Sequence, residues 1–75
     1  MPRPDVPVAH IFPRLVEDSH HQVHHWWGIE WVLPGKPFGQ GTRSGQIYGT
    51  KRGTVEIARE CGAQEDEIVF VESEP

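Results

Sequence analysis

One stretch of the sequence decides the fold: His20-His21-Gln22-Val23-His24-His25-Trp26-Trp27-Gly28-Ile29-Glu30-Trp31-Val32-Leu33. It contains four of the five histidines and all three tryptophans of the chain. Side chains alternate between the two faces of an extended strand, so Trp27 and Trp31 share one face while Trp26 and Val32 share the other. The stretch therefore predicts a strand over residues 22–33 with apolar side chains on both faces.

Size and charge bound the rest of the interpretation. The chain has 75 residues, a formal net charge of −4 and one cysteine, Cys61. Such a chain forms one domain that buries only about 60% of the surface that its unfolded form exposes. Domains of this size are often stabilised further by a disulfide, a metal ion or a partner chain. A single cysteine excludes an internal disulfide and suits a reducing, cytoplasmic location. We expect neither a signal peptide nor a membrane helix, because no apolar run has the required length.

The first 21 residues differ in character from the rest. Prolines stand at positions 2, 4, 7 and 13. Proline lacks a backbone donor and fixes φ, which disfavours a helix or a central strand. We therefore divide the chain into a proline-rich extended arm, residues 1–21, and a small domain, residues 22–75. The arm is expected to lie across its own domain or a neighbouring subunit.

Four elements are predicted after the tryptophan-rich strand. They are a turn-rich loop at 34–43, a short strand at 46–48, a helix at 51–61 and a strand at 68–71. Thr50 is expected to cap the start of the helix through its hydroxyl, and Gly62 is expected to end it.

These elements predict an α+β fold of the ββαβ type, with a three-stranded sheet and one crossover helix. The tryptophan-rich strand is expected at the centre, which gives the strand order 2-1-3, and the two strands joined by the helix are expected to be parallel. One helix covers one face of such a sheet. The other face carries Trp26 and Val32 and needs a cover. The arm, a second copy or a protein partner would supply it, and we favour a second copy.

Three segments carry a resemblance to a known class of domain: 27–32 (Trp-Gly-Ile-Glu-Trp-Val), 50–60 (Thr-Lys-Arg-Gly-Thr-Val-Glu-Ile-Ala-Arg-Glu) and 68–71 (Ile-Val-Phe-Val). From Trp27 to Val71 the chain resembles small bacterial ββαβ domains of uncharacterised function. These pair a Trp-containing strand with a second strand and a helix of the type Thr-Lys-x-x-Ala-x-x-x-Ala-Arg. Gly53 and Thr54 stand where that family prefers alanine. The resemblance implies a fold and no activity.

The histidine cluster is the first candidate site. Its members are His20, His21, His24 and His25. Imidazole is a ligand for zinc and nickel, so the cluster predicts a site for one of these metals, with further donors from elsewhere in the chain. The alternatives are polar surface histidines with no ligand, and a contact that changes with pH because imidazoles titrate near neutrality.

The second candidate site is a basic segment without acidic residues between Glu30 and Glu56. Its basic residues are Lys36, Arg43, Lys51 and Arg52. The amides of a Gly39-Gln40-Gly41 loop can hold a phosphate, which predicts an anion or nucleic-acid site. The alternative is a flexible loop that its charges keep in solvent. The negative charge of the whole chain argues against nonspecific nucleic-acid binding.

No catalytic residue is predicted, because neither Ser19 nor Ser44 nor Cys61 lies in a recognisable catalytic motif. We therefore expect a non-enzymatic binding module without an organic cofactor, which self-associates through the sheet face that carries Trp26 and Val32. A zinc- or nickel-binding protein and a nucleic-acid- or phosphate-binding protein are the alternatives.

Overall fold

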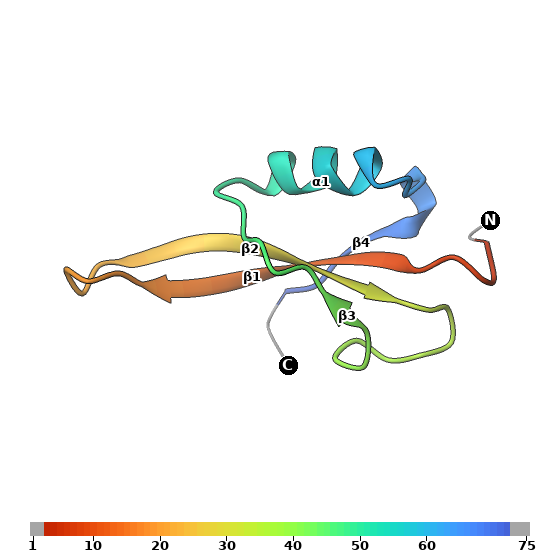
Figure 1. Cartoon of the computed structure of the whole chain (residues 1–75), viewed down its shortest axis with the longest axis horizontal. Coiled ribbons are helices and arrows are strands. Elements are labelled where there is room, and N and C mark those ends of the chain that lie inside the picture. Colours follow the sequence, from red (N-terminus) through yellow and green to blue (C-terminus); the bar gives the residue numbers. More distant parts are fainter. Residues whose placement is uncertain (1–2, 73–75) are drawn as a thin grey trace.

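The computed structural model describes residues 3–72, which form a four-stranded mixed sheet with a helix on one face (Figure 1). In chain order the elements are β1 (Val8–Glu17), β2 (Val23–Val32), β3 (Thr42–Arg43), α1 (Lys51–Glu60), a 3₁₀ turn η1 (Glu65–Glu67) and β4 (Ile68–Phe70). The strand order across the sheet is β3-β2-β1-β4. The contacts of β1 with β2 and of β2 with β3 are antiparallel, and β1 runs parallel to β4.

A long hairpin of β1 and β2 forms the centre of the sheet. The ladder runs from Val8 opposite Val32 to Glu17 opposite Val23. β4 pairs with β1 only as far as Ile11, so the far end of the hairpin has no third strand beside it. Figure 1 shows this end projecting beyond the helix, and the molecule measures 44 × 22 × 19 Å. We call residues 14–26 the outer hairpin.

The predicted three-stranded sheet of order 2-1-3 is wrong. Residues 8–17, which were assigned to an extended arm outside the sheet, form the inner strand β1. Pro13 is tolerated there because of its position. The carbonyl of Ile11 accepts a hydrogen bond from the amide of Val71, which directly follows β4, so odd-numbered residues of β1 direct their backbone groups away from β2. The missing backbone N–H of Pro13 would therefore point to the β4 side of β1. At that position β4 has already ended, so no hydrogen bond is lost. The predicted boundary between residues 21 and 22 falls inside the hairpin turn.

The remaining strands also differ from the prediction. The strand expected at 46–48 is replaced by β3, and only Tyr48 of that segment exchanges backbone hydrogen bonds with Trp27, at 2.8 and 2.9 Å. β4 lies beside β1 and not beside the tryptophan-rich strand. Because β1 occupies the side of β2 that was assigned to the last strand, the helix connects two strands at opposite edges.

The predicted helix and both of its ends are confirmed. α1 begins after Thr50, whose hydroxyl oxygen accepts a hydrogen bond from the amide of Gly53 at 3.0 Å. The hydroxyl of Thr54 donates to the carbonyl of Thr50 at 2.7 Å. Gly62 follows the helix with φ of 100°, the left-handed conformation that glycine adopts without strain.

The helix packs on the sheet face that Trp27 and Trp31 share, as their spacing predicts. The buried centre of this layer consists of Ala9, Ile11, Ile29, Ala58 and Ala63. Trp27, Trp31 and Tyr48 pack around it and remain partly exposed. The helix therefore covers the inner half of the hairpin and leaves the outer half free.

The opposite sheet face is covered by the chain itself. The loop after β2 carries Phe38 back under the sheet, where its ring stacks on His10 with a centroid distance of 5.6 Å and contacts Phe12 at 5.5 Å. Phe12 and Val32 are each 1% exposed. Val32 is therefore already buried within its own chain, and a second copy on this face, with Trp26 and Val32 at the interface, stays a prediction.

Phe12 fits over Gly28, its cross-strand partner, so closely that a larger residue has no room. A Cβ atom at position 28 would lie 2.6 Å from Phe12 Cζ. We expect Gly28→Ala to lower the free energy of unfolding by about 1–3 kcal/mol in urea titrations, because the buried ring has to shift. Gly45→Ala is the matched control, since a Cβ there meets no atom within 4 Å. Equal stability of the two variants would contradict this packing.

Candidate functional site

A buried carboxylate organises the loop side of the sheet. Glu30 is 1% exposed and lies on β2 between Phe12 and the loop. Its carboxylate accepts hydrogen bonds from the amides of Gly39 and Gly41 and from Nε of Arg43, the last at 3.1 Å. Arg43 also lies over the ring of Phe12, with its guanidinium carbon 4.6 Å from the centroid. We call this set the Glu30 clasp.

The clasp keeps Glu30 ionised. Burial by itself would raise the pKa of Glu30, but the two glycine amides and the Arg43 guanidinium outweigh burial and lower the pKa below its usual value. A buried carboxylate is stable only where hydrogen-bond donors replace water, and three donors do so here. The loop is therefore held to the sheet by its own anion site.

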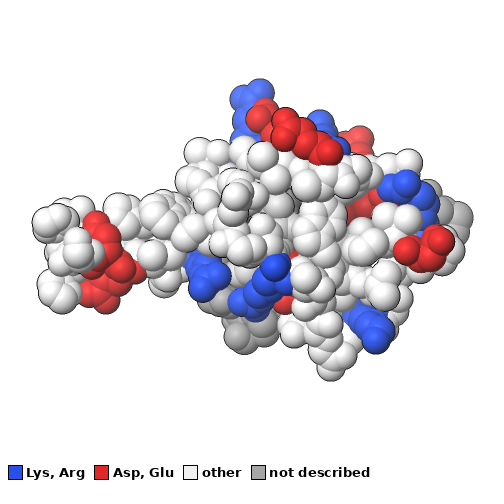
Figure 2. Space-filling model, in the orientation of Figure 1, with Lys and Arg blue, Asp and Glu red and all other residues white. Residues whose placement is uncertain are grey.

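The predicted phosphate cradle thus already holds an anion. The amides of Gly39 and Gly41 point at a carboxylate of the same chain, and Arg43 neutralises it. The other predicted basic residues lie elsewhere: Lys36 is exposed in the loop, Lys51 stacks over Trp27 and Phe70, and Arg52 pairs weakly with Glu56 on α1. The structure does not bring the four basic residues together. Figure 2 shows basic side chains scattered over the body of the molecule.

A second buried carboxylate ties the two ends of the described chain together. The Glu67 side chain is fully buried and accepts hydrogen bonds from Nε and Nη2 of Arg3 at 3.0 and 2.7 Å. The amides of Arg3 and Gln64 donate to the same carboxylate at 3.2 and 2.9 Å. Arg3 Nη2 also donates to the carbonyl of Gly62. These contacts fix the start of β1 against the turn that leads into β4.

The outer hairpin is closed by a turn built on Asp18. One carboxylate oxygen accepts from the amides of His20 and Gln22 at 2.8 and 3.0 Å, and the other contacts His24 Nε2 at 2.8 Å. The hydrogen bond with His24, followed by that with the Gln22 amide, lowers the pKa of Asp18. His21 has φ of 62°. Asp18 therefore holds a turn that places one residue in the left-handed region.

The four candidate metal ligands are divided among separate contacts. His24 pairs with Asp18, and His21 Nδ1 lies 2.8 Å from a Glu17 carboxylate oxygen. His25 lies on the opposite face of the hairpin from His24, and His20 is exposed in the turn. Over residues 3–72 no group of three or more His, Cys, Asp or Glu side chains is placed to hold a metal ion. The metal site stays a prediction.

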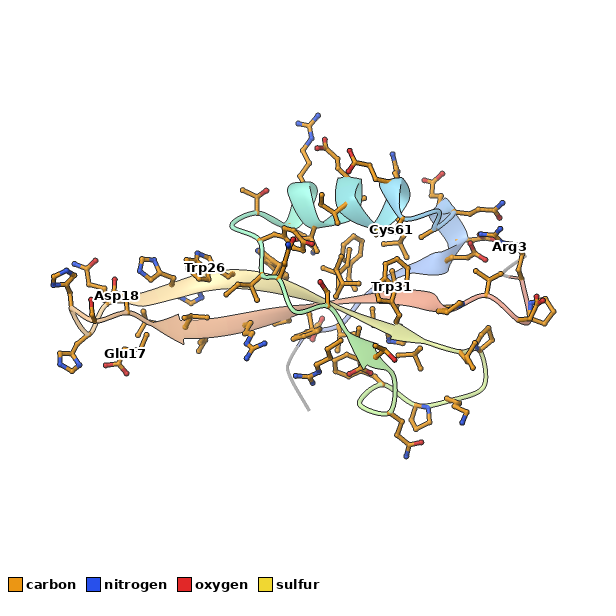
Figure 3. All side chains as sticks on the ribbon, in the orientation of Figure 1. Arg3, Glu17, Asp18, Trp26, Trp31 and Cys61 are labelled. Atoms are coloured by element: carbon orange, nitrogen blue, oxygen red, sulfur yellow. The ribbon has the colours of Figure 1, made fainter. Side chains whose placement is uncertain are left out.

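The outer hairpin exposes apolar side chains on a thin, two-stranded ribbon. Leu15 and Val23 are 64% and 55% exposed and lie on the helix side of the ribbon. On the other face Trp26 is half-buried and stacks on His24, with ring centroids 5.2 Å apart. Figure 3 shows Trp26 on this ribbon, with Glu17 and Asp18 near its tip. The surface combines an aromatic, two aliphatics and acidic groups.

A hollow lies at the other end of the molecule. It has a volume of about 290 Å³ and is lined by Val6, Pro7, Trp31, Cys61, Gly62 and Ala63. Figure 3 shows Cys61 at the end of α1, on the same side of the sheet as Trp31. Arg3 contacts the next residue, since its Nη2 donates to the carbonyl of Gly62 at 3.0 Å. Cys61 is exposed. The lining is largely apolar and lies beside the Arg3–Glu67 contacts.

Comparisons with protein-family models, curated proteins and solved structures found no match. In the part of the chain that the structure describes, no helix is both long enough and apolar enough to span a bilayer. The functional interpretation is therefore based on the geometry of this chain alone.

Sequence patterns alone did not reveal the two buried carboxylates or the exposed ribbon. Glu30 gave a usable signal, since it is a lone acidic residue within an otherwise apolar strand. The sequence contains no such signal for Glu67, because Glu65 and Asp66 precede it and nothing local distinguishes the one that is buried. The exposure of Leu15 was hidden by its assignment to an arm.

We expect the Glu67 contacts to make stability depend on acidity. Arg3, and next the Gln64 amide, lower the pKa of Glu67 from 4.5 to about 2. Their stabilisation is complete above pH 4.5 and disappears as the pH falls towards about 2, because the unfolded chain takes up the proton first. Glu67→Gln should lower the unfolding midpoint in urea at neutral pH and flatten its acid dependence. Glu65→Gln, in the same turn but exposed, is the control and should change neither. Identical pH profiles for the Glu67 variant and the original chain would contradict a stabilising role of the Arg3–Glu67 contacts.

Zinc titration tests the histidine cluster. Because His21, His24 and His25 point to different partners or faces, we expect weak binding without defined stoichiometry in isothermal calorimetry. Replacement of His20, His21, His24 and His25 by alanine should leave that weak binding almost unchanged. Tight stoichiometric binding that the alanine variant loses would support the metal site and show that the hairpin tip rearranges around the ion.

Proposed function

We propose that this protein is a non-enzymatic module that binds a protein partner through its outer hairpin. One observation carries the proposal: residues 14–26 form a bare two-stranded ribbon on which Leu15 and Val23 are mostly exposed. A two-stranded hairpin alone is only marginally stable in water. Contact with a partner would bury its apolar side chains and stabilise its strands.

The backbone of the ribbon supports the same proposal. Trp27 and Ile29 direct backbone groups away from β1, since their bonds go to Tyr48 and Ser44. Backbone direction alternates along a strand, so Val23 and His25 also point outward. No strand described in the structure pairs with them. An extended partner segment can add to this edge through backbone hydrogen bonds, with Trp26 as an aromatic anchor beside it.

Charge favours a protein over a nucleic acid as the partner. Glu17 and Asp18 lie at the tip of the ribbon, and Figure 2 shows acidic side chains at this projecting end. The four basic residues that suggested nucleic acid are dispersed, and Arg43 is engaged by Glu30. A phosphate backbone would be repelled by the tip. With one cysteine in the chain, we place this interaction in the cytoplasm.

The state of the perturbed carboxylates supports a binding role over catalysis. Strongly shifted carboxylates often mark catalytic acids and bases. Glu30 and Glu67 are both buried, and each is saturated by donors of its own chain that hold a loop or a terminus. Their contacts serve the architecture, whereas the outer hairpin presents exposed apolar side chains and a strand edge that no described strand pairs with.

A photo-cross-linking residue at position 15 tests the proposal in the intact chain. In extract from the source cells, we expect a discrete protein adduct from position 15 and none from position 52, whose native Arg52 side chain is 93% exposed on α1. Trp26→Ala should weaken binding of the captured partner by at least about 2 kcal/mol, roughly thirtyfold, as anchor residues do. Position 15 yielding the same adducts as position 52, or no adduct, would sink the proposal.

A further inference from the structure

No strand among residues 3–72 pairs with the outer edge of β4. β4 is the last strand in the order β3-β2-β1-β4. Val69 and Phe70 are 42% and 50% exposed. Sheet edges are commonly protected by proline, lysine or a bulge. Residues 68–72 contain neither proline nor lysine, so this edge is unguarded.

The backbone direction of this edge is known from its pairing with β1. The amide of Val71 donates to the carbonyl of Ile11 at 2.8 Å, and Ile11 is the register partner of Phe70. In a parallel ladder this pattern turns Val69 and Val71 towards β1. Within β4, the alternate residues Ile68 and Phe70 therefore direct their N–H and C=O groups away from the sheet. These two residues offer donors and acceptors to another strand.

A shallow groove runs along this edge on the helix side. It has a volume of about 120 Å³ and is lined by Val55, Arg59, Glu65, Ile68 and Phe70. Lys51, Val55 and Arg59 follow one another at four-residue spacing, so they lie along one side of α1. The ammonium of Lys51 lies 4.3 Å from the centroid of the Phe70 ring. The groove is apolar at Val55, Ile68 and Phe70, and it carries one basic and one acidic side chain, Arg59 and Glu65, with Lys51 beside Phe70.

We propose that a second copy of this chain pairs with this edge, with the two β4 strands antiparallel and related by a two-fold axis at Phe70. Phe70 then exchanges backbone hydrogen bonds with the partner's Phe70, and Ile68 comes opposite the partner's Glu72, which lies two residues after β4. Phe70 directs its backbone groups outward on both copies. The pairing is isologous, so it closes as a dimer and does not extend into a filament.

The side chains of this register are complementary on both faces. On the helix side the two Phe70 rings meet at the axis, and the partner's Glu72 comes opposite Ile68, whose groove contains both Arg59 and Glu65. A carboxylate thus arrives beside a guanidinium, twice in the dimer. On the other side Val69 lies opposite the partner's Val71, an apolar pair. A strand of the chain's own sequence therefore fits the edge in charge and in hydrophobicity.

The dimer would join two four-stranded sheets into one continuous sheet of eight strands. The axis reverses strand direction, so the two outer hairpins point to opposite ends. Two partner-binding ribbons in one particle raise avidity for a partner that presents two sites. The dimer contact and the outer hairpin share no residue. The experiments on the dimer therefore test it independently of the proposed function.

Charge exchange across the interface tests this register on the full-length chain. We expect sedimentation velocity over a dilution series to show a monomer–dimer equilibrium for the original sequence. Arg59→Glu and Glu72→Arg should each weaken dimerisation by about tenfold or more, because each change places like charges together at two symmetric positions. The double variant should recover most of the original affinity. Arg52→Glu, on an exposed part of α1, is the control and should leave the affinity unchanged.

Phe70→Lys provides a second test at the centre of the interface. It should abolish the dimer while circular dichroism and the unfolding midpoint confirm a folded monomer, since Phe70 is half-exposed in the single chain. A monomer at every concentration of the original chain would overturn the proposal. So would a dimer that ignores all these changes, or one that Leu15→Asp disrupts, because either result places the contact elsewhere. Pairing of an acidic extended peptide with monomeric protein would assign the edge to a different occupant and would also overturn it.

Discussion

The Glu30 carboxylate is the constraint on which the arrangement of this sheet depends. A charged group that is 1% exposed needs donors, and the chain supplies them from a loop that folds under β2. That loop brings Phe38 against His10 and Phe12, which closes the face opposite the helix. Arg43 completes the donor set and at the same time forms β3 by pairing with Glu30. One buried charge therefore fixes a loop, an edge strand and a covered face.

The Glu67 carboxylate plays a related part at the helix side. Arg3 and Glu67 are separated by 64 residues in sequence, yet they form a two-pronged contact that holds β1 next to β4. Buried ion pairs add little stability by themselves, but they are strongly specific, because a misplaced partner leaves a charge without compensation. In a domain this small, two such contacts give the sheet order a specificity that a modest apolar core would not supply alone.

Function follows from what these two contacts leave uncovered. The helix covers one face of the sheet, and the loop covers the other, so the body offers little open apolar surface. Apart from Leu33 in the loop after β2, the exposed large apolar side chains lie on the outer hairpin (Leu15 and Val23) and on the β4 edge (Val69 and Phe70). Both are strand edges, and both present backbone groups along with apolar side chains. A chain with this distribution is suited to pairing with other chains through its strands.

Local signals in the sequence by themselves determined the tryptophan-rich strand, the capped helix and the stop at Gly62, because alternation and capping depend on neighbouring residues only. The sequence also indicated that Gly39 and Gly41 form an anion site. Only the tertiary structure decided that the anion is Glu30, since that requires the loop to return to its own strand. It likewise decided that residues 8–17 are a strand, because Pro13 is harmless only where β4 ends. Strand order and long-range ion pairs depend on partners distant in sequence, and no local pattern reports them.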